Sequence, residues 1–246
     1  MTGRSAPAVL PPSLRGWLGL MAALASLLVV TLGIRYADDS RPGPVDTRIS
    51  TVVDGVTPPW RHVALALDFL GEPVGAVTAV LATVTGCLLL RRPRAAVLVV
   101  AGTGAAVGTA TLLKSLVGRT IHDGNLSYPS GHTAFLTSLA LAAALLVTDR
   151  LRLGRTAGAS LVLGAALVAG AAMGWAQVAL GAHYPTDVLG GWCTALALTP
   201  ATAWLVDRTA DRMTDRMTDR PDHRTADRST GGTTDRTVEA GRGERR

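Results

Sequence analysis

The sequence is poor in aromatic residues, which make up only 4% of its 246 residues, although 48% of the residues are hydrophobic. Packing must therefore rely on alanine, valine, leucine and glycine, and small residues of this kind let membrane helices approach one another closely. The mean hydropathy is +0.31. This composition favours an integral membrane protein over a soluble one.

Cysteine and lysine are also scarce. The two cysteines, Cys87 and Cys193, lie in apolar segments that should place them near opposite membrane surfaces, so a disulfide between them is not expected. Lys114 is the one lysine of the chain, and arginine supplies every other strongly basic side chain. The net charge of +6 forms no single patch, because the arginines are spread over short loops and the C-terminal segment. This distribution argues against nucleic acid as a partner and fits membrane orientation by positive charge.

Six apolar stretches are predicted to cross a bilayer core of about 30 Å as helices that rise about 1.5 Å per residue. They run approximately over residues 17–34, 74–90, 95–113, 133–147, 157–180 and 188–206. We therefore predict an all-α fold, an integral membrane six-helix bundle over residues 14–206. Residues 1–13 are expected to be flexible, residues 35–60 to form a loop, and residues 62–70 to lie at the membrane interface.

The C-terminal segment, residues 207–246, has a different composition. Asp-Arg pairs recur there with almost nothing apolar between them, which predicts a disordered polar tail. The basic turns at 91–94 and 149–155 indicate the cytoplasmic side. Both termini of this multi-pass protein are thus expected in the cytoplasm, and the loops at 114–132 and 181–187 on the extracytoplasmic side of the cell membrane.

The first of these loops ends in Tyr128-Pro129-Ser130-Gly131-His132, at the start of the fourth apolar stretch. Ser130 offers a hydroxyl group, and Gly131 lets the backbone approach a ligand closely. The N-terminus of a helix attracts anions, and His132 in its first turn can give a proton to a leaving oxygen. Taken alone, the segment equally fits an ordinary helix start with a histidine at the interface.

The second loop contains His183 and Asp187, which are four residues apart, about one helical turn. A carboxylate at this spacing can orient the imidazole and leave its other nitrogen free to attack phosphorus. An interfacial histidine followed by a capping aspartate is the alternative. Lys114 supplies an ammonium group, a usual phosphate ligand, although a lysine at a span end can also reach toward the interface. Arg119 can add a planar guanidinium fork.

These segments resemble the motifs of the type 2 phosphatidic acid phosphatase (PAP2) superfamily, in its membrane lipid phosphatase branch. The resemblance covers roughly residues 60–205. The Pro-Ser-Gly-His motif is intact and ends at His132, His183 and Asp187 keep the spacing of the last motif, and Lys114 stands where the first motif begins.

Two arginines of the family pattern are replaced in this sequence. Ile121-His122 stands in place of the Arg-Pro of the first motif, and Ala176-Gln177 in place of the Ser-Arg before the last histidine. A lost hydrogen bond from a charged group to a transition-state oxyanion costs several kcal/mol, roughly two or more orders of magnitude in rate. Arg119 and Gln177 are the nearest residues that can compensate.

The resemblance implies a membrane phosphatase that hydrolyses the phosphate ester or diphosphate of a lipid through a phosphohistidine intermediate. Candidate substrates are a polyprenyl diphosphate, phosphatidate or phosphatidylglycerol phosphate. His183 would attack, Asp187 would orient it, and His132 would protonate the leaving oxygen. The phosphate-binding residues would be Lys114, Arg119, Ser130, Gly131 and Gln177. No cofactor or metal is expected, because a cationic pocket can neutralise the developing charge. The expected partners are a phosphorylated lipid and membrane lipids, not nucleic acid, and the oligomeric state stays open.

Two other interpretations remain. Because two motif arginines are replaced, the chain is alternatively a catalytically impaired PAP2-like protein that binds phosphorylated lipids. A transporter or membrane scaffold would not need His183 at all. The haloperoxidase branch of the superfamily fits poorly, because six spans leave no large soluble body.

Overall fold

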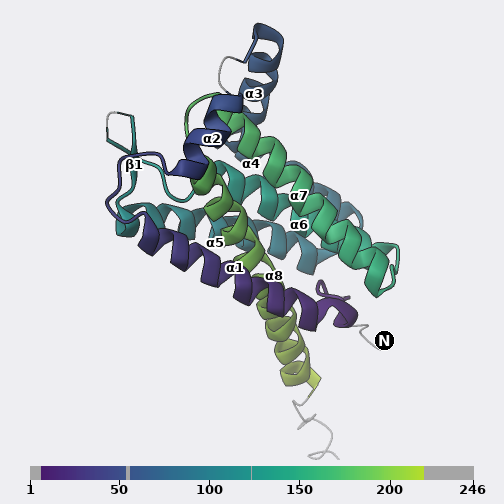
Figure 1. The fold of residues 1–246 in the computed structure, drawn as a ribbon. Coiled ribbons are helices and arrows are strands. Elements are labelled where there is room, and N and C mark those ends of the chain that lie inside the picture. Colours follow the sequence, from purple (N-terminus) through teal and green to yellow (C-terminus); the bar gives the residue numbers. More distant parts are fainter. Residues whose placement is uncertain (1–6, 54–55, 123, 219–246) are drawn as a thin grey trace, which may run out of the picture.

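The computed structural model describes residues 7–53, 56–122 and 124–218. Within these ranges the chain is almost entirely helical, with one short hairpin (Figure 1). A 3-10 turn, Pro12–Leu14, precedes the helices α1 (Arg15–Arg35), α2 (Pro44–Val53), α3 (Pro58–Gly71), α4 (Pro73–Leu89), α5 (Pro93–Val117), α6 (Gly131–Arg150), α7 (Arg155–Ala179) and α8 (Pro185–Thr218). The strands β1 (Thr120–Ile121) and β2 (Asn125–Leu126) pair antiparallel between α5 and α6.

Five of the described helices are long and apolar enough to cross a membrane: α1, α5, α6, α7 and α8. The helices α3 and α4, which meet at 68°, pass the same criteria only as a pair, so the described residues hold five candidate spans, or six if this bent pair is one span. The prediction of an all-α membrane helix bundle is thus confirmed, and the protein is a multi-pass membrane protein. The second span differs from the prediction, because the segment expected at the interface and the apolar helix after it form one broken unit.

The break between α3 and α4 follows from Pro73. Proline has no N–H group and its ring clashes with the carbonyl four residues earlier, so it is favoured at a helix start and disrupts a helix interior, and α4 begins at Pro73. Glu72 before it has φ −69° and ψ 154°, an extended conformation that is usual before proline. The chain therefore turns a corner at Glu72.

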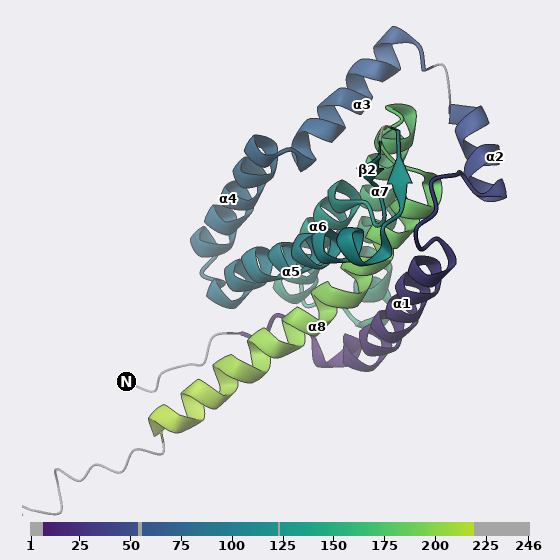
Figure 2. The ribbon, with the colours of Figure 1, turned by 90° about the vertical axis from the view of Figure 1, so that its left-hand side faces the viewer.

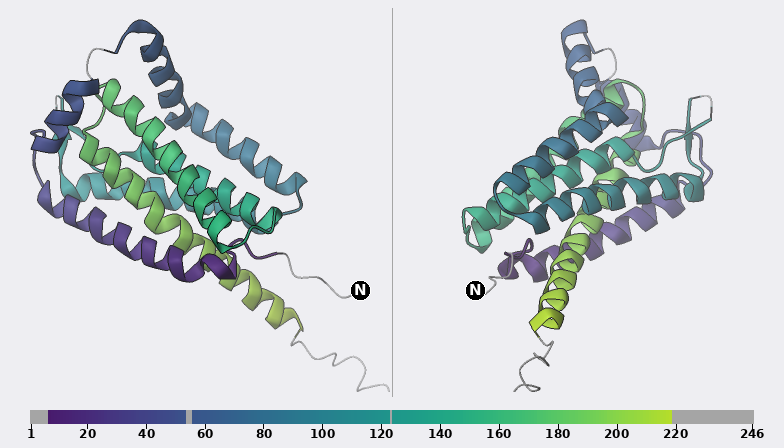
Figure 3. Two further views of the ribbon diagram at one scale, coloured as in Figure 1. Left: turned by 45° about the vertical axis from the view of Figure 1, so that its right-hand side comes forward. Right: turned by 180° about the vertical axis from the view of Figure 1, so that it is seen from behind.

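Helix α6 lies inside the bundle, in contact with α5, α7 and α8. Helix α1 packs on α8, while α4 packs on α5 and α3 on α7 (Figures 2 and 3). Mostly small side chains fill these contacts, as the composition predicts. Ala106, Ala166, Ala195 and Ala203, for example, are fully buried. Cys87 and Cys193 are buried free thiols, also as predicted.

The basic turns lie together at one end of the bundle. Arg92 forms an ion pair with Asp149, which joins the turn before α5 to the turn after α6. At the same end, the carboxylate of Asp207 accepts hydrogen bonds from the backbone N–H groups of Val9 (2.8 Å) and Leu10 (2.9 Å). The turns predicted to share one side of the membrane therefore lie at the same end of the bundle.

Three local predictions are wrong. Residues 9–13, expected to be flexible, include buried Val9 and Leu10 and a helical turn. Residues 44–53, expected within a loop, form α2. The disorder predicted from Asp207 onward does not begin there, because α8 continues to Thr218 and Asp207 is buried. The remainder of the predicted tail, residues 219–246, and residues 1–6 lie outside the described residues.

Candidate active site

The two histidine motifs meet because α8 passes very close to the start of α6. The backbone N–H of Ser130 donates to the carbonyl oxygen of Asp187 at 2.9 Å. A Cβ atom at Gly191 would lie 2.2 Å from the carbonyl oxygen of Ser130, and one at Gly190 would lie 2.5 Å from the ring of Tyr128. Glycine at both positions therefore permits the approach that brings the motifs together.

Ser130 caps the N-terminus of α6. Its side-chain oxygen accepts hydrogen bonds from the backbone N–H of Thr133 at 3.4 Å and from the hydroxyl of Thr133 at 3.1 Å. The first turn of a helix presents N–H groups without intrahelical partners and a partial positive charge. Gly131 and His132 occupy this turn, so the site has the anion-attracting helix end that the sequence predicts.

His183 lies in the loop between α7 and α8 and is 8% exposed. Its Nδ1 atom is 3.8 Å from Oδ2 of Asp187, slightly beyond hydrogen-bond distance. Burial lowers the pKa of His183 below its usual range, and this effect exceeds the opposite influence of the Asp187 carboxylate. The imidazole is therefore neutral at pH 7, the form in which it can act as a nucleophile.

Lys114 and His132 lie near His183. Lys114 belongs to the last turn of α5 and is half-buried. The charges of Lys114, His132 and Asp187 all act on His183, and the charge of Asp187 also acts on Lys114. The structure thus brings these four predicted residues to one site.

Arg119 lies deeper, beneath the second motif, and its side chain is 0% exposed. One terminal nitrogen, Nη1, donates to Oδ1 of Asp187 and to the hydroxyl of Thr186, both at 2.6 Å. The other, Nη2, donates to Oδ2 of Asp46 on α2 at 2.8 Å. Asp46 also accepts from the backbone N–H of Thr186 at 2.9 Å, so a single buried network fixes the carboxylate of Asp187.

The rings of Tyr36 and Tyr184 cover the Arg119 guanidinium, with centroids 3.9 Å and 4.6 Å from its central carbon. Both terminal nitrogens are bound and the planar group is stacked. The expectation that Arg119 holds phosphoryl oxygens is therefore not supported, since its hydrogen bonds go to the carboxylate that faces His183.

Gln177 also has a different place from the expected one. Its side chain is 1% exposed, and Nε2 donates to Oδ1 of Asp68 at 2.7 Å. The amide is thus bound to α3 and is not supported as a phosphate ligand. Ile121, the other replacement, is a buried apolar residue in β1 and brings no polar group to the site.

Two carboxylates that the sequence analysis missed lie beside His132. The Nε2 atom of His132 is 3.5 Å from Oδ1 of Asp68 and 3.6 Å from Oε1 of Glu72. Asp46 was missed as well, within the presumed loop. An available signal was that Asp68 interrupts an apolar stretch, because ionisable residues in such stretches are costly and often functional.

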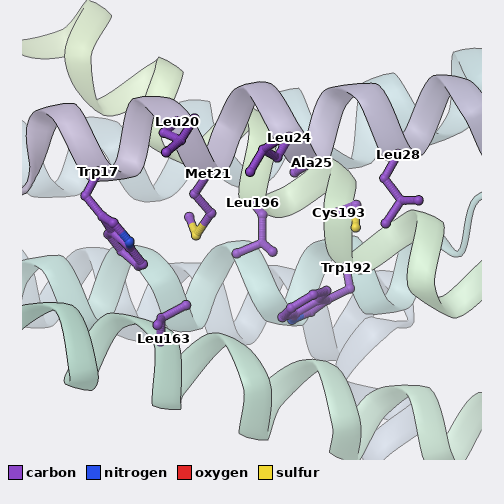
Figure 4. A pocket seen from close by; sticks show the side chains of 10 residues that line it. All are labelled: Trp17, Leu20, Met21, Leu24, Ala25, Leu28, Leu163, Trp192, Cys193 and Leu196. Carbon is purple, nitrogen blue, oxygen red and sulfur yellow. The ribbon is translucent and has the colours of Figure 1, made fainter.

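An apolar groove of about 330 Å³ lies between α1, α7 and α8 (Figure 4). Trp17, Leu24, Trp192 and Leu196 are among the ten residues that line it. None of the ten carries a charge, so the groove offers no group for phosphate chemistry. The histidine end of the bundle is therefore the candidate active site.

The fold and this site define an integral membrane protein with paired histidines at one end of a helical bundle. The sequence matches the PAP2 superfamily over residues 16–211, and the chain therefore belongs to the PAP2 superfamily. This confirms the family that the motifs predict.

One solved structure with a similar fold is that of a transmembrane PAP2 type phosphatidylglycerolphosphate phosphatase from Bacillus subtilis. The TM-score is 0.61 and the sequence identity 21%, over 78% of this chain and 96% of that chain. At this identity the likeness shows a shared fold. No curated protein matches the sequence.

Proposed function

We propose that this protein is a membrane phosphatase that removes the phosphate group of a lipid ester or diphosphate through a phosphohistidine intermediate. The observation that carries the proposal is the buried, neutral His183, within reach of Asp187 and close to Lys114. Membership of the PAP2 superfamily supports it, as does the fold shared with a lipid phosphatase.

In the first step the free nitrogen of His183 attacks phosphorus. A nitrogen–phosphorus bond forms, and the bond from phosphorus to the lipid oxygen breaks. The imidazole becomes cationic, and Asp187 stabilises this charge from the Nδ1 side. A gap of 3.8 Å closes with a small rotation of the ring, and catalytic hydrogen bonds commonly shorten when substrate binds. Protonated His132 gives its proton to the departing oxygen, so the lipid leaves as an alcohol or monophosphate.

In the second step water attacks the phosphohistidine. His132, now neutral, takes a proton from the water, and the nitrogen–phosphorus bond breaks. Inorganic phosphate leaves, and His183 and His132 return to their starting states.

The phosphoryl oxygens would be held by the ammonium of Lys114, the hydroxyl of Ser130 and the N–H groups at Gly131, where the helix end favours an anion. Arg119 acts one layer deeper, because its hydrogen bonds fix Asp187. By the positive-inside rule, the site faces away from the cytoplasm and both termini lie inside the cell.

The test is phosphate release by the purified full-length protein in detergent, with phosphatidate, phosphatidylglycerol phosphate and a polyprenyl diphosphate as substrates. We expect release from one of them to be abolished in His183→Ala and unchanged in the matched control His122→Ala, whose exposed imidazole lies in the hairpin turn. Acid-labile, base-stable labelling of the wild type by labelled substrate would support the intermediate. Release that survives His183→Ala would contradict the proposal.

A second candidate is a protein that binds phosphorylated lipids without turning them over. The replacement of two motif arginines by Ile121 and Gln177, and the two carboxylates beside His132, favour it. Saturable binding of the same lipids, with no phosphate release that depends on His183, would support this candidate instead.

A further inference from the structure

A second groove lies between α1 and α8, at the end of the bundle that carries the basic turns. Its volume is about 500 Å³, and ligand pockets commonly have volumes of about 300–1,000 Å³. The groove extends from Arg15 to Ala22 on α1 and from Pro200 to Trp204 on α8. About seven residues of helix rise roughly 10 Å. The groove therefore follows the helices from the basic end of the bundle into its apolar part.

Small residues leave this groove open. Its wall on α1 contains Gly16, Gly19 and Ala22, and its wall on α8 contains Ala201. A Cβ atom at Gly16 or Gly19 would meet nothing within 4 Å. Other exposed positions of α1 carry large apolar side chains, such as Leu20, Leu24 and Leu27. An acyl chain can thus lie close to the backbone of α1, and in a bilayer such van der Waals packing is a main source of binding energy.

An aromatic ring and two arginines lie at the mouth of the groove. Trp204 is 44% exposed, and tryptophan is enriched where membranes meet water, at the level of the lipid headgroups. The guanidinium of Arg208 lies over the Trp204 ring, 4.9 Å from its centroid. Arg15 lines the mouth from the side of α1. A guanidinium group can donate two parallel hydrogen bonds to a phosphate, so the mouth suits an anionic headgroup.

Contacts behind the mouth hold it in place and leave its charge available. The Nε atom of Arg15 donates to the carbonyl oxygen of Leu10 at 3.4 Å, and the N–H of Leu10 donates to the carboxylate of Asp207 at 2.9 Å. Asp207 and Asp211 form their ion pairs with Arg94. Within the part of the chain that the structure describes, Arg15 forms no ion pair. Its positive charge is therefore not neutralised by these carboxylates.

We propose that this groove binds one anionic phospholipid from the leaflet at the basic end of the bundle. One acyl chain lies against Gly16, Gly19 and Ala22, and the headgroup phosphate lies between Arg15 and Arg208. Anionic lipids are attracted to basic side chains near the membrane surface, whereas the ammonium group of a zwitterionic lipid is repelled by them. A lipid that binds here contacts both α1 and α8 and stabilises their packing. The site is remote from the histidines, so the proposal does not rest on the proposed function.

The test compares two lipids that differ in headgroup charge. The purified full-length protein in detergent is titrated with phosphatidylglycerol and, separately, with phosphatidylcholine, both with brominated acyl chains that quench tryptophan fluorescence on contact. We expect saturable quenching with an affinity at least about tenfold higher for phosphatidylglycerol, because each basic contact adds to the attraction. The preference should disappear in Arg15→Gln/Arg208→Gln. It should persist in the control Arg152→Gln/Arg155→Gln, which removes the same charge from exposed positions at the same end.

A second pair of variants tests the place of the acyl chain. Gly19→Leu should fill the groove, leave both arginines in place and abolish the saturable quenching by phosphatidylglycerol. Gly104→Leu is the matched control, because Gly104 is exposed on α5 and also has open space around its Cβ. Melting temperatures of all variants show whether they fold, and Arg208→Gln alone serves if the double arginine variant does not.

Equal affinity of the wild type for the two lipids would overturn the proposal. A preference for phosphatidylglycerol that survives in Arg15→Gln/Arg208→Gln or in Gly19→Leu would also overturn it. A preference that is lost in Lys114→Ala but kept in the arginine variant would place the lipid at the histidine end instead. Phosphate release is measured separately, so a protein that binds phosphatidylglycerol in the groove but releases no phosphate would retain the lipid site and refute the phosphatase.

Discussion

The buried network around Arg119 allows a quantitative prediction for Arg119→Met. The side chains of Arg119, Asp46 and Asp187 are all 0% exposed, and the substitution leaves both carboxylates without the partner that they share. Removing one member of a buried ion pair typically costs about 3–5 kcal/mol. For a chain of this size each kcal/mol corresponds to roughly 2–4 °C in melting temperature, so we expect a decrease of about 6–20 °C.

The kinetic effect should follow from the misplacement of Asp187. Because Arg119 touches the carboxylate and not the substrate, kcat for phosphate release should fall more than tenfold while KM changes little. Melting is followed by intrinsic fluorescence in detergent, and kinetics with the substrate identified above. Arg35→Met is the matched control, because Arg35 is exposed and also stacks on Tyr36, with its central carbon 5.3 Å from the ring centroid. Surface substitutions of this kind change stability by about 0.5 kcal/mol or less.

One combination of stability and kinetic results would contradict this role of Arg119. In that case Arg119→Met would melt within about 2 °C of the wild type, which corresponds to roughly 1 kcal/mol or less. It would also raise KM and leave kcat unchanged, which would mean that Arg119 binds the substrate directly. The sequence-based expectation would then be right and the buried network would be of little consequence.

Three further predictions concern the site. Because burial lowers the pKa of His183, its imidazole stays neutral as the pH falls through about 6.5. The single-turnover rate of phosphohistidine formation should therefore be constant through that pH and decline only below it. A decline centred above about 6.5 would contradict the lowered pKa. The same shift means that this imidazole reduces stability as the pH falls below about 6.5, so His183→Ala should melt with a weaker dependence on pH there. Gly191→Ala should lower the free energy of unfolding by about 1–3 kcal/mol and remove most of the activity, because its Cβ would meet the carbonyl of Ser130. Gly164→Ala is the control, with open space around its Cβ, and should be neutral or slightly stabilising. Equal melting temperatures of the two variants would contradict the close approach of α8 to α6.

The helical architecture was predictable because it depends on local signals. Long apolar stretches set the spans, and prolines at Pro93 and Pro185 mark helix starts within two or three residues of those expected. The sequence predicted the corner between α3 and α4 only in part. Pro73 predicts a helix start, but the 68° bend also depends on the packing of α3 against α7.

Helix α2 and the role of Asp46 were not predictable for a different reason. Asp46 binds Arg119 and Thr186, which lie 73 and 140 residues away in the sequence. Contacts between residues so far apart leave no periodic pattern in the local sequence. The segment around Asp46 has balanced charge, as an ordinary polar loop does.

The motif residues His132, His183 and Asp187 were predictable as a group, because together they match the ordered motifs of the PAP2 superfamily. The partners of Arg119 and Gln177 were not. A sequence shows that a guanidinium or an amide is present near a motif, but not which buried acceptor binds it first. Both side chains turned out to be bound to carboxylates that come from helices distant in the sequence.

The hydrogen bonds of Asp207 have a practical consequence for anyone who shortens the protein. Hydropathy alone would place the end of the membrane domain at Val206, where the apolar stretch stops. That cut would leave the N–H groups of Val9 and Leu10 without their acceptor and remove a carboxylate 3.5 Å from the buried Arg94. A chain that ends beyond Asp211, which forms an ion pair with Arg94 at 2.9 Å, keeps these hydrogen bonds and ion pairs. Deletion libraries and fused reporters should therefore start from that point.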